Sequence, residues 1–113
     1  MIGYHYSPAA NAESIRRHGL LVPTKHPRLV QPMVCSAGHR NPHISLGKTP
    51  AQAWELSGGF LLRRASERRE EAVDVAWDLW QVDLAGIRYA TNGYELQVRT
   101  DIRKSRLTYV GSR

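Results

Sequence analysis

Apolar and polar residues alternate in three short segments of the chain, and this period of two predicts β-strands. In residues 2–6 the apolar side chains fall on one face and His5 falls on the other. Residues 94–99 repeat the pattern with Glu95 on the polar face, and residues 77–84 form a third strand of this kind. The expected apolar faces consist of Ile2, Tyr4 and Tyr6; of Trp80, Val82 and Leu84; and of Tyr94, Leu96 and Val98.

Residues 11–18 carry the features of a short helix. Asn11 is a suitable N-cap residue, and the cations of the last turn complement the negative end of the helix dipole. Gly19 follows at the position where a glycine commonly ends a helix. The apolar residues 20–22 are expected to pack against the core directly afterwards.

The strongest local signal in the sequence predicts a second helix that begins after Thr49. Thr49 is a capping residue, Pro50 fits the first helical position, and Gln52 completes a capping box. Gly58–Gly59 ends or weakens this helix, since each glycine costs about 1 kcal/mol there. A helical pattern resumes over residues 60–72.

Residues 23–43 contain four prolines and little periodicity, so they are expected to form a long loop. Loops of this length in a small domain are often binding elements. Cys35, His39 and His43 are spaced by four, a spacing that would gather metal ligands on one face of a helix. Pro42 disfavours a helix at that point, so no metal site is expected.

The order of elements predicts one α+β domain over residues 1–113, with a mainly antiparallel sheet and a few helices. Further short strands are expected at residues 43–46 and 107–110. An apolar fraction of 42% and a charged fraction of 23% exclude disordered, collagen-like and coiled-coil proteins. No apolar run reaches the length of a membrane span and no secretory signal is visible, so a cytoplasmic protein that does not enter a membrane is expected.

The chain has a formal net charge of +6, and 13 of its 16 basic residues are arginines. Arginine binds phosphates and carboxylates through two parallel hydrogen bonds and stacks on bases. One interpretation is attraction to a polyanion or a phosphate-bearing ligand. The other is a composition that only reflects codon usage and solubility, which the lack of a dense basic block favours.

Two polar residues stand out because each lies in an otherwise apolar strand. His5 and Glu95 would be reachable by a ligand if they lay at the inner edge of the sheet. Alternatively, both would simply occupy the solvated face of an antiparallel sheet that is covered on one side. Periodicity alone favours the second interpretation.

Four blocks of the sequence, in this order, resemble ADP-ribosyltransferase-like domains. They cover most of the chain and resemble small bacterial or phage members of that family, including toxins. The blocks are Tyr4-His5-Tyr6-Ser7 with a helix closing in Gly19-Leu20; Ile44 to Pro50 running into Ala53-Trp54; Asp78 to Leu84; and Tyr94 to Val98 followed by Leu107 to Val110.

This resemblance implies a split β-sheet that holds NAD in a cleft. By this resemblance, His5 would contact the nicotinamide ribose. Glu95 would be the catalytic residue, which stabilises the transition state as nicotinamide leaves. The other residues that the resemblance places near NAD are Tyr6, Ser7, Ser45, Trp54 and Gln97. A carboxylate beside a developing cation lowers the barrier electrostatically.

The chain departs from the family pattern at two positions. The second block reads Ile44-Ser45 where a tyrosine would stack on nicotinamide, so Trp54 or Tyr6 would have to supply stacking. Gln97 stands where arginine-modifying members carry a second glutamate.

Three hypotheses about function therefore stand side by side. The first is an enzyme that transfers ADP-ribose from NAD to a protein or nucleic-acid acceptor. The second is a domain of the same fold that has lost catalysis and binds a host protein or a nucleotide. The third is a basic nucleic-acid-binding protein.

Overall fold

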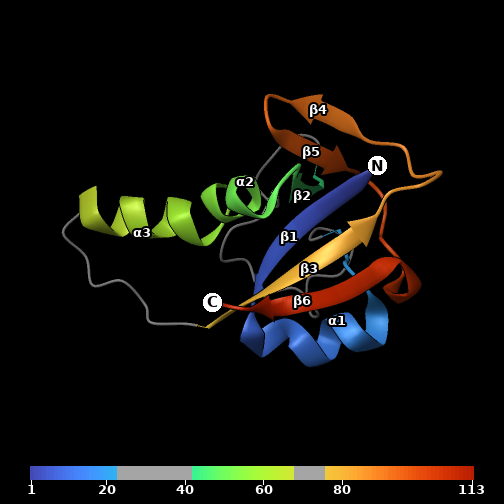
Figure 1. Cartoon of the computed structure of the whole chain (residues 1–113), viewed down its shortest axis with the longest axis horizontal. Helices are drawn as coiled ribbons and strands as arrows, with labels where there is room; N and C mark the ends of the chain where they lie inside the picture. Colours follow the sequence, from blue (N-terminus) through green and yellow to red (C-terminus); the bar gives the residue numbers. More distant parts are fainter. Residues whose placement is uncertain (23–41, 68–75) are drawn as a thin grey trace.

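A computed structural model describes residues 1–22, 42–67 and 76–113 of the chain. These residues form an α+β fold in which helices accompany one six-stranded antiparallel sheet, which confirms the expected fold class (Figure 1). The elements are β1 (Ile2–Pro8), η1 (Ala9–Asn11), α1 (Ala12–His18), β2 (Ile44–Gly47), α2 (Pro50–Glu55), α3 (Gly58–Glu67), β3 (Trp77–Asp83), β4 (Ala90–Asn92), β5 (Glu95–Val98), η2 (Lys104–Arg106) and β6 (Leu107–Ser112).

The strands follow the order β4-β5-β2-β1-β3-β6, and every pair of neighbours is antiparallel. β1 and β3 pair along their whole length, from Ile2 opposite Asp83 to Pro8 opposite Trp77. In contrast, β1 and β2 are in register at one position, where Tyr4 lies opposite Gly47. The described sheet therefore consists of two three-stranded halves that separate beyond a single shared pair.

One face of the sheet and the segment around α1 enclose the main core. Ile15 of α1 is buried there, as are Leu20 and Val22 just after the helix. The sheet and the chain before β6 supply Ile44, Leu46, Trp80, Val82, Leu84, Leu96, Val98 and Ile102. The alternation correctly predicted the core faces of β3 and β5, since pleating sends every second side chain to the same face. The core face expected for β1 was wrong: Ile2, Tyr4 and Tyr6 lie outside the main core, because the register sets His5, and not these residues, opposite the core residue Trp80.

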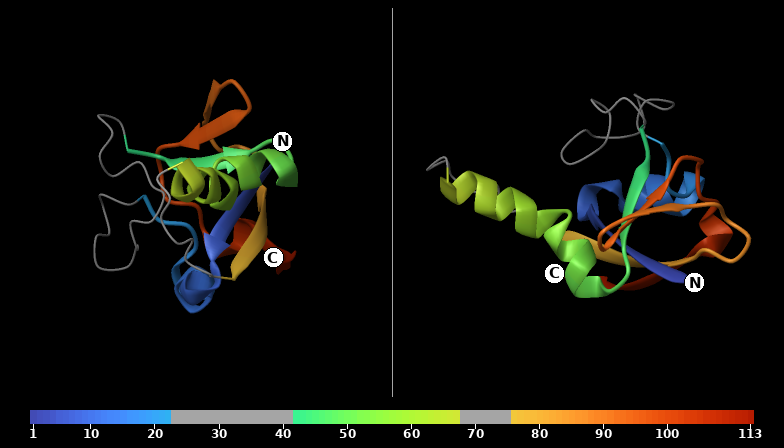
Figure 2. Two further views of the ribbon diagram at one scale, coloured as in Figure 1. Left: turned by 90° about the vertical axis from the view of Figure 1, so that its left-hand side faces the viewer. Right: turned by 90° about the horizontal axis from the view of Figure 1, so that it is seen from above.

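The other face carries an aromatic cluster beneath α2. The Trp54 ring lies 5.2 Å from that of Tyr6 and 5.8 Å from that of Trp77, both edge to face. α3 begins directly after α2 and extends away from the sheet (Figure 2). A Cβ on Gly58 would lie 2.3 Å from the Trp54 ring, so the glycine that was expected to weaken a helix here permits close packing of Trp54.

Of the two predicted N-caps, Thr49 caps its helix and Asn11 does not. Thr49 Oγ1 accepts a hydrogen bond from the Gln52 N–H at 3.2 Å and Pro50 occupies the first turn, as predicted. The capping box is incomplete, because Gln52 Oε1 is buried without a hydrogen-bond partner in the described chain. Asn11 lies at the N-cap of α1, but its side chain donates to Ser7 Oγ at 3.5 Å and does not cap the helix.

The strand predicted over residues 94–99 begins one residue later than expected. Tyr94 belongs to a turn with Gly93 and is exposed, because β5 starts at Glu95 and pairs with the unpredicted strand β4. The helical pattern of residues 60–72 is confirmed up to Glu67, and its remainder lies outside the described residues. None of the helices in the described ranges has the length and apolar character needed to cross a membrane.

Candidate functional site

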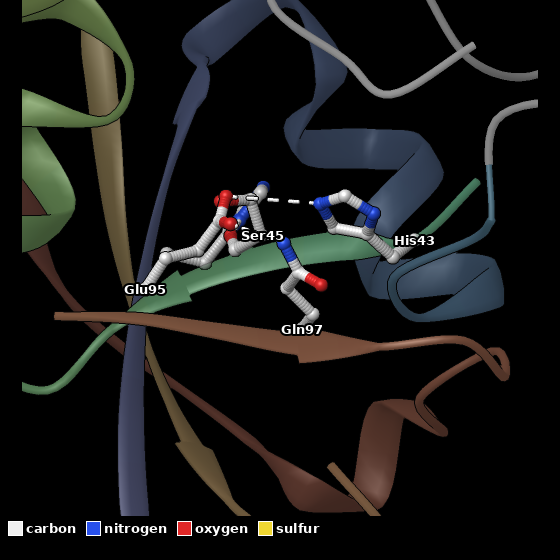
Figure 3. Close-up of polar contacts among 5 residues, drawn as sticks. His43, Ser45, Glu95 and Gln97 are labelled. Atoms are coloured by element: carbon white, nitrogen blue, oxygen red, sulfur yellow. Dashed lines mark hydrogen bonds and ion pairs between the residues drawn. The ribbon is translucent and has the colours of Figure 1, made fainter. Parts of the chain in front are cut away.

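The structure brings together four of the seven residues that the resemblance places at a site. Ser45 on β2 is the centre of the group: its Oγ donates to Glu95 Oε2 at 2.5 Å, and its main-chain oxygen lies 2.9 Å from His5 Nδ1. Gln97 Nε2 donates to Glu95 Oε1 at 2.5 Å. Figure 3 shows the carboxylate of Glu95 turned toward Ser45, above the strands that carry both residues.

The register of β2 and β5 explains this geometry. Ser45 lies opposite Gln97, and Gly47 lies opposite Glu95. Because Gly47 has no side chain, the carboxylate of Glu95 can lean diagonally along the strand to Ser45. A Cβ on Gly47 would also lie 2.3 Å from the Ala53 nitrogen, so the close approach of α2 requires glycine at this position.

His5 joins the group at the point where the two halves of the sheet separate. The neighbouring residue Tyr4 makes the shared pair between β1 and β2, and His5 bonds to the Ser45 carbonyl in place of a main-chain donor. Burial lowers the pKa of His5 from its ordinary value, and the hydrogen bond to Ser45 offsets only part of this effect. The imidazole is therefore neutral at pH 7, with its Nδ1–H as the donor.

A second histidine, His43, completes the group. Its Nε2 lies 3.7 Å from Glu95 Oε2, and its side chain is only 5% exposed (Figure 3). The spacing of Cys35, His39 and His43 in the sequence suggested His43 only as a metal ligand. The signal that could have found it is the spacing of two from Ser45, which places both residues on the same face of a strand.

The metal interpretation receives no support in the described ranges, which contain no group of three histidine, cysteine or acidic side chains able to hold an ion. Cys35 and His39 lie outside the described residues.

The other three residues that the resemblance places near NAD lie elsewhere. Tyr6 and Trp54 pack on each other under α2, where Trp54 also carries the Arg113 guanidinium 4.1 Å from its ring centre. Ser7 is buried and accepts from Asn11. None of the three makes a hydrogen bond or ring contact with Glu95 within the described part of the chain.

The assembled group has a definite chemical capacity. Two donors fix both oxygens of the Glu95 carboxylate, whose side chain remains 17% exposed. A carboxylate fixed in this way stabilises positive charge that develops on a bound molecule without reorganising first. The hydroxyl of Ser45 and the amide of Gln97 beside it can orient hydroxyl groups of a bound molecule by hydrogen bonding.

Comparison with known proteins gives no further assignment, because neither a protein-family model nor a curated protein matches the chain.

Proposed function

We propose that the chain is an ADP-ribosyltransferase-like domain that cleaves NAD at the bond between nicotinamide and ribose and transfers ADP-ribose to a macromolecule. The observation that carries this proposal is the fixed carboxylate of Glu95, which Ser45 and Gln97 hold by hydrogen bonds to both oxygens. The main-chain oxygen of the same serine accepts a hydrogen bond from His5. The separation of the sheet between β1 and β2 supports it, because the resemblance implies a split sheet.

In the proposed reaction, the bond between the ribose carbon and the nicotinamide nitrogen breaks. Nicotinamide leaves with the bonding electron pair and becomes neutral. The ribose becomes an oxocarbenium-like cation, and the negative charge of Glu95 lowers the energy of this state. A lone pair of the acceptor then forms the new bond to the same carbon, and the acceptor releases its proton to solvent.

The remaining residues of the group would position the substrate. Ser45 and Gln97 keep the carboxylate oxygens directed at the ribose, and neutral His5 contributes hydrogen bonding at the ribose. A misdirected carboxylate loses much of its effect, since electrostatic stabilisation depends on preorganised geometry.

The test is incubation of the protein with NAD labelled in the adenosine portion, together with a cell lysate. The wild type is expected to release nicotinamide and to label a macromolecule, and Glu95→Gln is expected to lose both activities. Glu67→Gln, the same change at an exposed position on α3, should retain them. Turnover by Glu95→Gln at the wild-type rate would overturn the proposal.

A second candidate function is NAD binding without transfer, and Gln97 is the observation that favours it. A glutamine cannot serve as a second charged group for a cationic acceptor. In this case NAD would raise the melting temperature by stabilising the native state, with no release of nicotinamide. Nicotinamide release above the level of Glu95→Gln would exclude this candidate.

A further inference from the structure

The last turn of α1 and the short helix η2 are adjacent, and both are rich in cations. Leu20 and Ile102 exchange two main-chain hydrogen bonds of 3.0 and 2.8 Å, which hold the two segments together. Gly19 permits this approach, because a Cβ there would lie 2.1 Å from the Ile102 oxygen. We call the resulting region the α1–η2 surface; it consists of Arg16, Arg17, His18, Arg103, Lys104, Arg106 and Tyr109.

Only part of the positive charge on this surface is neutralised. Arg17 pairs with Glu13 at 2.9 Å, and Arg106 lies 3.7 Å from Asp83. Arg16, Arg103 and Lys104 are exposed and have no ion-pair partner among the described residues. Three arginine or lysine charges on one small surface are therefore available to a polyanion.

Stabilisation of the helix does not account for this arrangement. Cations at the end of α1 complement its dipole, and this effect would be the same if η2 were neutral. Arg103 and Lys104 lie in a separate segment, and the tertiary contact at Gly19 brings them beside the helix. The helix dipole of α1 therefore explains the cations of α1 but not the neighbouring cations of η2.

An aromatic ring lies on the same surface. Tyr109 on β6 is 45% exposed, and the Arg16 guanidinium lies 5.9 Å from its ring centre. The Tyr109 ring also packs edge to face against Trp80, with the ring centres 5.6 Å apart, and the Tyr109 hydroxyl lies 2.6 Å from Ser112 Oγ. Exposed rings that are already ordered stack on unpaired bases at little entropic cost.

We propose that the α1–η2 surface binds single-stranded nucleic acid. Arg103 and Lys104 contact phosphates, and Tyr109 with Arg16 provides a platform on which a base stacks. Single strands are favoured over duplexes because a base must be unpaired to cover the ring. The proposal uses none of the residues around Glu95 and stands whether or not the chain acts on NAD.

The first test is a salt titration with a fluorescent oligo-dT of about 12 nucleotides, followed by anisotropy. Affinity of the wild type is expected to fall steeply with salt, and Arg103→Ala/Lys104→Ala should reduce the logarithmic slope by about 0.7 for each lost phosphate contact. The matched control is Lys48→Ala/Arg63→Ala, which removes two exposed charges on the side of α2 and α3. Equal weakening in both double variants, or no binding by the wild type at about 50 mM salt, would overturn the proposal.

The second test concerns the ring. Tyr109→Leu should weaken binding of oligo-dT about fivefold or more without changing the salt slope. Tyr94→Leu is the control, since Tyr94 has almost the same exposure, 44%, and lies in the β4–β5 turn. An unchanged affinity of Tyr109→Leu, or equal competition by duplex DNA or by polyglutamate, would contradict the proposal. Circular dichroism of all variants verifies that they are folded.

Discussion

The hydroxyl of Ser45 donates to Glu95 Oε2 at 2.5 Å, although the two residues are fifty positions apart in the sequence. The same serine accepts from His5 through its main-chain oxygen. Ser45 therefore connects the strand that carries the imidazole to the strand that carries the carboxylate, across the place where the sheet separates.

Replacing Ser45 with alanine should destabilise the fold and misdirect the carboxylate. A hydrogen bond to a charged group contributes about 1.5–3 kcal/mol, so we expect the free energy of unfolding to fall by about that amount in urea titrations. Nicotinamide release should fall at least about tenfold. Ser105→Ala, at an exposed position in η2, is the control and should change neither quantity. Equal stability of the two variants would show that the bond to Glu95 contributes nothing.

The lowered pKa of His5 makes stability depend on pH in a definite direction. In the unfolded chain the imidazole titrates near 6.5, whereas in the folded protein it stays neutral to lower pH because burial disfavours its charged form. Below about pH 6.5 the unfolded state therefore binds more protons, and stability is lost as the pH falls. Urea unfolding between pH 5 and 8 should show this loss in the wild type and a smaller loss in His5→Gln. The control for the substitution itself is His18→Gln, the same change at an exposed position in α1.

Both its positive φ angle and the close approach of Ile102 require glycine at position 19. A comparison with Gly86, which has only the positive φ angle, separates the two effects. Both residues have positive φ angles, 78° and 73°, which favour glycine over residues with a side chain. A Cβ on Gly19 would also collide with the Ile102 oxygen, whereas nothing lies within 4 Å of one on Gly86. Gly19→Ala should therefore lower the free energy of unfolding by clearly more than Gly86→Ala. Equal effects in chemical denaturation would mean that α1 and η2 do not pack as closely as described.

Leu96 supports the site from the opposite face of β5. It is fully buried, so Leu96→Ala should cost about 2–5 kcal/mol of unfolding free energy through lost transfer energy and the cavity left behind. Leu62 on α3 is 48% exposed, and the same substitution there should stay within about 0.5 kcal/mol. Thermal or urea unfolding of the two variants checks this contrast, and similar losses would mean that Leu96 does not belong to the core.

The sequence by itself determined the local features of this protein. Alternation identified the strands β1, β3 and β5, and in β3 and β5 it also identified the buried faces, which carry Val82 and Leu96. The start of α2 at Thr49 and the end of α1 at Gly19 also followed from the sequence. These features are readable because they depend on periodicity and on hydrogen bonds between residues a few positions apart.

Only the tertiary structure decided which of these residues meet. The resemblance placed Trp54 and Tyr6 near NAD, but the two rings pack on each other under α2, whereas His43 lies next to Glu95. The proximity of η2 to α1 was equally unpredictable. Such contacts depend on strand order and register between segments tens of residues apart, and no local pattern encodes that pairing.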